Sequence, residues 1–212
     1  MMFKHFILTR FNLDIYNPNG PYASTVGNDP IVWMNHRIKL FEKYCLPSVQ
    51  AQSCKDFTWI IAFDPETDPA VISKYDCLEN VEICYEQPHE YLRRKQPEAE
   101  WIITTRIDND DRMHPNFVKR IQERFNHKTK IVDVDYYAYD IFRDAYYTSG
   151  RPRNNSMYLS LIEPWTHGIV TAMGHHHSTM PDYYETEKIE TVLVYQTLHG
   201  RNIANKINGI RV

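Results

Sequence analysis

The sequence predicts an α/β fold, with a mixed but mainly parallel central sheet, helices on its faces and a small second sheet region. Short apolar runs alternate with helix-spaced segments through the first half of the chain, which is typical of a parallel sheet with crossover helices. The second half is richer in strand-like runs and loops. With 212 residues, 42% of them hydrophobic, the chain is expected to form one domain with a substantial core.

The first half begins with a predicted strand and a long loop. Residues 6–9 form an apolar run, and residues 12–30 are rich in Asn, Pro and Gly, which favour loops. Residues 33–52 carry apolar side chains at roughly helical spacing, with a break expected at Pro47 because proline disrupts a helix interior. Further runs predict strands at 57–63, 81–85 and 101–107, and a short helix within 66–78.

The second half contains one predicted helix and several predicted strands. Phe117, Val118, Ile121 and Phe125 recur at helical spacing, which predicts a helix over residues 115–126. Residues 86–100, which precede the strand at 101–107, are polar and interrupted by prolines. Apolar and aromatic runs predict the later strands at 131–142, 157–162, 168–173 and 191–199.

The most informative feature is a cluster of carboxylates where the strand at 101–107 ends. Asp108, Asp110 and Asp111 follow this apolar run directly, and their negative charges repel unless a cation lies among them. Oxygen ligands favour Mg²⁺ or Mn²⁺, and ligands of open α/β sheets bind outside the carboxyl ends of strands. The pattern indicates metal-assisted chemistry on a phosphorylated substrate. The alternative is an acidic turn that caps the helix starting near Pro115.

Charge and cysteine content narrow the functional classes. The net charge is −3 and the pI about 6.4, so a basic field for nucleic acid is absent and such a partner is not expected. Cys45, Cys54, Cys77 and Cys84 form no CxxC pair, which indicates reduced thiols and a cytoplasmic location. The sequence shows no signal peptide and no run near the ~20 apolar residues of a membrane span.

Several segments together resemble a known family. Residues 46–52 (LPSVQAQ) and the strand that leads to Asp64 and Asp68 resemble the early part of family 2 glycosyltransferases. The TTRIDNDD run at 104–111 resembles the DxD motif of the GT-A superfamily. With FILTRFNL at 6–13, RIKLFEKYCLPSVQAQ at 37–52, LSLIEP at 159–164 and HGRN at 199–202, the chain resembles a family of rhamnosyltransferases over nearly its whole length.

The resemblance implies a GT-A fold, which is the Rossmann-like fold of nucleotide-diphospho-sugar transferases. Residues 1–112 would bind the nucleotide, and residues 113–212 would form the acceptor side. The implied reaction moves rhamnose or another hexose from a UDP- or dTDP-sugar to a glycan or another hydroxyl acceptor. Mn²⁺ or Mg²⁺ would be held by Asp108, Asp110, Asp111 and the late His199, since histidine is a common metal ligand.

Further residues are expected to contact the nucleotide. Thr9 and Arg10 end the first strand, and a guanidinium suits phosphate. Asp64 could accept from a uracil or thymine ring, or it could open a turn before Pro65. The remaining expected nucleotide contacts are Arg106, which could instead pair with an aspartate, together with Asp108 and Asn109.

The catalytic base is left open by two departures from the family 2 pattern. Pro65 and Glu66 replace Gly and Ser in the turn after the second strand, and no E-D pair follows the acidic motif. Glu163 and Asp182 are the base candidates, because a base must reach the acceptor hydroxyl. The loop at 12–30, with the Asn17-Pro-Asn-Gly-Pro21 run, is expected to close over the donor as a lid.

Three other functions fit parts of the pattern. A non-catalytic nucleotide- or glycan-binding module could keep the fold without the reaction. A nucleotidyltransferase also combines carboxylates, metal and nucleotide, but no Gly-rich phosphate loop follows the first strand. A glycosyltransferase acting on modified DNA bases is disfavoured by the mild acidity of the chain.

Overall fold

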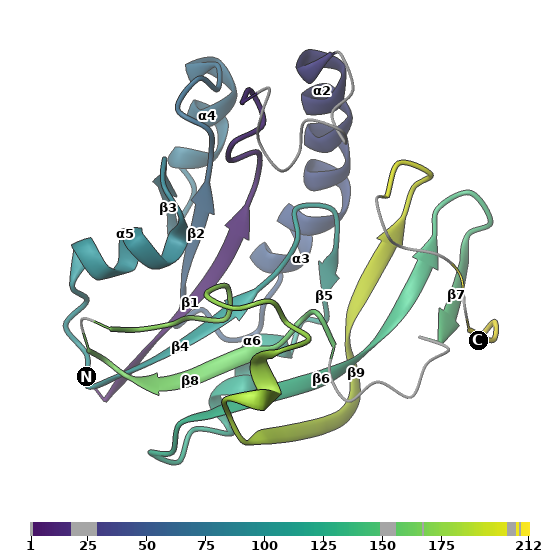
Figure 1. Cartoon of the computed structure of the whole chain (residues 1–212). Coiled ribbons are helices and arrows are strands. Elements are labelled where there is room, and N and C mark those ends of the chain that lie inside the picture. Colours follow the sequence, from purple (N-terminus) through teal and green to yellow (C-terminus); the bar gives the residue numbers. More distant parts are fainter. Residues whose placement is uncertain (1, 18–28, 149–155, 167, 203–206, 208) are drawn as a thin grey trace.

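The computed structural model describes residues 2–17, 29–148, 156–166, 168–202, 207 and 209–212. In this part of the chain one mixed sheet has the strand order β3-β2-β1-β4-β8-β6-β9-β5, and β7 pairs with β6 (Figure 1). The strands are β1 (Phe3–Arg10), β2 (Thr58–Ala62), β3 (Val81–Cys84), β4 (Trp101–Arg106), β5 (Arg112–Met113), β6 (Lys130–Asp140), β7 (Ala145–Thr148), β8 (Ser160–Pro164) and β9 (Thr186–Leu198).

The first four strands form a parallel half that is buried on both faces. β1 pairs in parallel with β2 on one side and β4 on the other, and β3 extends the sheet beyond β2. Successive side chains of a strand point to opposite faces. Phe6 and Leu8 pack in the cluster that includes Leu92 of α5 (Pro88–Lys95), whereas Ile7 packs with Phe41 and the other large core cluster. This double burial explains the continuous apolar runs of the sequence.

The predicted helix over residues 33–52 is one continuous helical rod. The Asp29 carboxylate caps it by accepting from Ile31 N and Val32 N, both at 3.0 Å, and Pro30 occupies the first turn. The expected disturbance at Pro47 takes the form of a π-helical turn, because a proline in this position cannot donate an ordinary i−4 hydrogen bond. The rod consists of α2 (Pro30–Leu40), the π turn η1 (Phe41–Cys45) and α3 (Leu46–Gln50).

The remaining helices confirm two predictions and add one. The expected helices within 66–78 and 115–126 are α4 (Pro69–Asp76) and α6 (Phe117–Gln122), and α6 buries Phe117, Val118 and Ile121. The added helix is α5, with Pro88 in its first turn and Arg93, Arg94 and Lys95 in its last. Its start and stop signals were present in the sequence, but its low hydrophobicity concealed it.

The strand predicted over residues 168–173 is wrong. The backbone of this segment donates to side chains: Val170 N and Thr171 N donate to the Glu163 carboxylate, and Ala172 N donates to Thr104 Oγ1. Thr171 also has a positive φ of 66°, which interrupts an extended chain. The segment is apolar because Ile169 and Ala172 are buried in the core, and burial alone does not make a strand.

The long strands β6 and β9 carry the sheet into its second region. They run parallel to each other, with register shifts around Val134, Asp135 and Tyr136. Before the shifts β6 pairs with β8, and beyond them it pairs with β7, while β5 pairs with the later part of β9. Figure 1 shows β7 and the far ends of β6 and β9 extending away from the parallel half. The strands expected at 131–142 and 191–199 are confirmed, and β9 begins earlier than expected, at Thr186.

No helix in the described part of the chain is long and apolar enough to cross a membrane. All four cysteines are free thiols. Most of the loop expected to act as a lid, residues 18–28 with Pro18 to Pro21 among them, lies outside the described residues.

Candidate active site

The acidic turn lies at the carboxyl edge of the sheet, next to the point where strand order reverses. The chain runs outward from β1 to β2 and β3 and then crosses back to β4, so the carboxyl ends of β1 and β4 flank this switch point. Ligands of open α/β sheets bind at such a place. Two bonds fix the turn against β1: Ile107 N donates to Leu8 O at 3.1 Å, and the Asn109 amide donates to Phe11 O at 2.8 Å.

The three carboxylates do not converge on one point. Asp108 is the most open, with 39% of its side chain exposed, and it pairs with Arg106 Nη2 at 3.1 Å. Asp111 points inward, where it accepts from Tyr158 Oη and Thr197 N, both at 2.7 Å. Each carboxylate of the turn therefore has separate side-chain or backbone partners.

Asp111, which the sequence predicts as a metal ligand, has its side chain in the core of the described structure. Its side chain is buried and its oxygens are engaged with Tyr158 and Thr197. Burial, with the nearby charges of Asp110 and Asp108, raises the pKa of Asp111 well above its usual range. Burial disfavours the charged form of a carboxyl group, whereas the hydrogen bonds from Tyr158 and Thr197 favour it.

Asp110 forms the centre of a chain of four polar side chains. Its Oδ2 lies 2.9 Å from Nε2 of His199, which follows β9, and it also accepts from Arg37 of α2. His199 Nδ1 lies 3.1 Å from Nε2 of His36, one residue before Arg37. The sequence interpretation missed His36 and Arg37, because nothing in an amphipathic helix marks which polar residues face a distant strand end.

These four side chains shift one another's pKa values. Burial opposes ionisation of Asp110, but the hydrogen bond from His199 and the positive Arg37 outweigh it and lower the Asp110 pKa. The pKa of His36 is lowered first by burial and then by its neighbours His199, Arg201 and Arg37. Asp110 is thus a stable anion, held between a guanidinium and an imidazole.

The donor set suits a metal completed by the substrate, and it does not form an all-protein metal centre. Among the residues that the structure describes, no three His, Cys, Asp or Glu side chains cluster to hold an ion. Asp110 and His199 are nevertheless adjacent oxygen and nitrogen donors beside the sheet edge. Mg²⁺ sites commonly use one or two protein ligands and take the rest from phosphates and water. In the structure, the guanidinium of Arg37 supplies the positive charge at Asp110.

The other expected nucleotide contacts have mixed positions. Thr9 is fully buried, and its hydroxyl donates to Ile107 O and accepts from Trp59 Nε1, so its side chain faces the core and not the open edge. Arg10 is partly exposed at the end of β1. Asp64 Oδ1 accepts from Glu66 N at 2.9 Å, which is the turn-opening alternative that the sequence left open.

The two base candidates lie away from the acidic turn. Glu163 pairs with Ile102 near the start of β4. Ile102 precedes Asp108 by six residues, and six residues of extended strand span about 20 Å. Glu163 also accepts from Val170 N and Thr171 N, so it is a structural anchor. Asp182 lies in the 3-10 turn η2 (Met180–Asp182) before the start of β9, with the length of that strand between it and His199.

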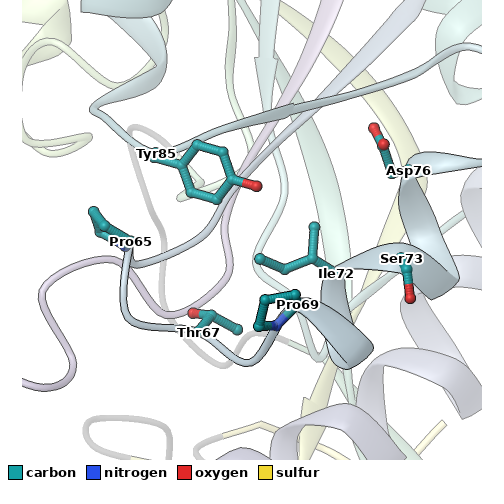
Figure 2. A pocket seen from close by; sticks show the side chains of 7 residues that line it. All are labelled: Pro65, Thr67, Pro69, Ile72, Ser73, Asp76 and Tyr85. Carbon is teal, nitrogen blue, oxygen red and sulfur yellow. The ribbon is translucent and has the colours of Figure 1, made fainter.

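A separate pocket of about 460 Å³ opens between the ends of β2 and β3 and helix α4. Figure 2 shows Tyr85 on one side of it and Ile72 and Pro69 on another. None of the residues predicted for the site lines this pocket, although Pro65 directly follows Asp64. The other lining residues are Thr67, Ser73 and Asp76.

The described sheet combines a parallel half of strand order 3-2-1-4 with later antiparallel strands, and the acidic turn follows β4. Residues 29–211 match the family described as "Putative rhamnosyl transferase", and the chain belongs to that family. The match includes the acidic turn and His199. It also includes α2, which supplies His36 and Arg37.

Solved structures show low-identity similarity to this chain. TarS 1-349 from S. aureus shares 15% identity at a TM-score of 0.49, over 93% of this chain and 60% of that one. A nucleotide-diphospho-sugar transferase from Desulfovibrio desulfuricans G20, itself described as putative, shares 9% identity at a TM-score of 0.44, over 93% and 82%. The chain therefore spans about three fifths of TarS 1-349. No match was found among curated protein sequences.

Proposed function

We propose that this protein transfers a hexose, rhamnose being the first candidate from the family description, from a UDP- or dTDP-sugar to a hydroxyl group of a glycan or other acceptor. The observation that carries the proposal is the Asp110–His199 pair beside Arg37, at the carboxyl edge of β4. In the reaction the acceptor oxygen bonds to the anomeric carbon, the bond from that carbon to the diphosphate breaks, and the nucleotide leaves with the electron pair.

The residues at this edge have complementary roles in the proposal. Arg10 and Arg106 offer guanidinium groups to the diphosphate, and Asp108 offers an exposed carboxylate to the nucleotide. Asp110 and His199 would hold Mn²⁺ or Mg²⁺, which when bound neutralises charge on the leaving diphosphate. Arg37 pairs with Asp110 in the structure. When the donor binds, Arg37 would pair with the diphosphate in place of Asp110, because a guanidinium binds phosphate as readily as carboxylate.

Nucleotide binding with and without metal tests the proposal. Calorimetric titration of UDP and dTDP should give tighter binding with Mn²⁺ than with EDTA. The metal would supply positive charge to the diphosphate, and the diphosphate would supply oxygen ligands to the metal. Equal affinity in both conditions would remove the metal from the proposal. His199→Gln should reduce the difference, and Arg120→Gln, on an exposed face of α6, serves as the matched control.

A donor screen then separates an enzyme from a binding module. Slow release of free sugar from one nucleotide-sugar, without an acceptor, is expected because water can replace the acceptor hydroxyl. If nucleotide-sugars bind but none in a broad panel is hydrolysed or transferred, the chain is better described as a binding module.

A further inference from the structure

A cage of four tyrosines surrounds Arg112, the residue that follows the acidic turn. The guanidinium carbon lies 4.4 Å from the ring centre of Tyr139, 5.2 Å from that of Tyr195, 5.6 Å from that of Tyr44 and 5.8 Å from that of Tyr146. Arg112 Nη2 also donates to the Tyr146 hydroxyl at 3.2 Å. Four rings around one cation make this the densest cation–aromatic cluster in the described part of the chain.

Strand register places the cage on one face of the second sheet region. Arg112 of β5 is opposite Tyr195 of β9, and Tyr195 is opposite Tyr137 of β6. Tyr139, two residues further along β6, is opposite Tyr146 of β7. Residues paired across strands, and residues two apart on one strand, share a face. Three strands thus present tyrosines beside Arg112, and Tyr44 of η1 packs over them.

Arg112 has no direct carboxylate partner in the described part of the chain, and the carboxylate of Asp144 contacts the cage only at the Tyr139 hydroxyl, 2.8 Å away. Of the carboxylates in the described ranges, none forms an ion pair with Arg112, whereas Arg37, Arg106 and Arg124 each have one. The Nε of Arg112 is buried and has no hydrogen-bond partner among the described atoms. The Arg112 guanidinium is partly buried among phenol rings and has no directly paired anion. A desolvated charge favours an opposite charge nearby, so an anionic ligand would be stabilised here.

The cage also borders the candidate active site. Arg112 is two residues from Asp110, so their backbones are at most about 7 Å apart. Its partner Tyr195 lies on the strand that ends at His199. Tyr139, Tyr146 and Tyr195 remain partly exposed. An aromatic ring with exposed surface can stack on the apolar face of a sugar while its hydroxyl remains polar.

We propose that the Arg112 cage is an acceptor subsite for a negatively charged sugar, in which the guanidinium binds a phosphate or carboxylate group and the tyrosine rings stack on the pyranose. This inference rests on the proposed function, because the cage is assigned to the acceptor. The proposed acceptor class is an anionic glycan, whose negative charge would pair with the Arg112 guanidinium.

Ligand-observed NMR with four probes tests the charge preference directly. The probes are glucose 6-phosphate, methyl β-glucuronide, neutral methyl β-glucoside and inorganic phosphate, each added to the full chain with saturating UDP and Mn²⁺. Both charged sugars should bind at least tenfold more tightly than the neutral one. Inorganic phosphate alone should compete weakly, because it lacks the stacked ring. Equal binding of charged and neutral sugars overturns the proposal.

Variants assign that preference to the cage. Arg112→Gln should remove at least tenfold of the affinity for charged sugars and leave the neutral sugar unchanged. Arg112→Lys, which keeps the charge but loses the planar fork, should have an intermediate effect and covers the case in which Arg112→Gln fails to fold. Arg120→Gln is the control on an exposed arginine. Unchanged charged-sugar affinity in the Arg112 variants overturns the assignment.

The acceptor-independent hydrolysis of donor distinguishes this proposal from the one on which it rests. Hydrolysis should persist in the Arg112 variants, because the cage is not assigned to the donor. If wild-type protein shows no preference for charged sugars but still hydrolyses the donor, the subsite alone is defeated. Absence of both donor hydrolysis and sugar transfer in wild-type protein defeats the glycosyltransferase proposal, and the binding of charged sugars is then still measured independently by NMR.

Discussion

Asp110 and His199 are 89 positions apart in the sequence, yet Asp110 Oδ2 lies 2.9 Å from His199 Nε2. Both side chains are buried, and Arg37 reaches the same carboxylate oxygen from α2. The end of β9, the turn after β4 and the first helix of the rod therefore meet at a single carboxylate. Two predictions follow from this contact, and two more from the surroundings of Glu163 and His5.

Asp110→Asn should lower stability as well as abolish transfer. The substitution leaves Arg37, which is only 13% exposed, without its carboxylate partner. Removing one partner of a buried ion pair lowers the free energy of unfolding by about 3 kcal/mol. Repulsion among the free carboxylates would predict the opposite result, in which Asp110→Asn is as stable as the wild type or more stable. Urea unfolding of Asp110→Asn, Arg37→Gln and the double variant measures the coupling. Additive losses would show that the pair contributes little.

His199→Gln should weaken metal-assisted nucleotide binding by at least tenfold, with a smaller effect in EDTA. Glutamine retains hydrogen-bonding capacity toward Asp110 but lacks the imidazole nitrogen that binds a metal. His36→Gln is the informative comparison, because His36 contacts His199 and not Asp110. If both variants lose the metal effect equally, orientation of His199 matters more than ligation by it.

Glu163→Gln should retain donor hydrolysis and lose stability. Both carboxylate oxygens accept backbone N–H groups, at 3.0 Å and 2.8 Å, and the amide can replace only one of these acceptors. The loss is expected to be about 1 kcal/mol. Thermal unfolding and donor hydrolysis measure the two effects, with the exposed Glu190→Gln as a control. A folded Glu163→Gln protein without activity would support Glu163 as the catalytic base.

Stability should fall as the pH falls from 6.5 toward 3, because of His5. Burial lowers the pKa of His5 from 6.5 to about 3, so in this window the unfolded chain binds a proton that the folded chain does not. The slope from this one group is about 1.4 kcal/mol per pH unit, and its contribution to stability is fully present above pH 6.5. Folded His5 is neutral and lies 2.8 Å from Thr105 Oγ1.

Denaturant unfolding across this pH range, for wild type and His5→Gln, measures the contribution. The variant should show a shallower acid slope, and His176→Gln, which changes an exposed histidine, should keep the wild-type slope. Parallel curves for wild type and His5→Gln would contradict the assignment.

The sequence determined the parallel half of the sheet and the position of the acidic turn. Strands that are buried on both faces need continuous apolar runs, so β1, β2 and β4 were visible as such in the chain. The turn after β4 was recognisable because three carboxylates directly follow an apolar strand. Helix α5 and the short strands β5 and β7 were not found, because their residues carry too little apolar periodicity.

Tertiary structure alone decided what each polar residue of the candidate site does. Asp108, Asp110 and Asp111 are almost consecutive, yet they pair respectively with Arg106, with Arg37 and His199, and with Tyr158 and Thr197. The tyrosines around Arg112 likewise come from four separate elements. Periodicity reports which face of an element is buried, because burial follows local composition. The partner that a polar group meets across 50 or 150 residues depends on how strands and helices pack in three dimensions, and no local pattern encodes that arrangement.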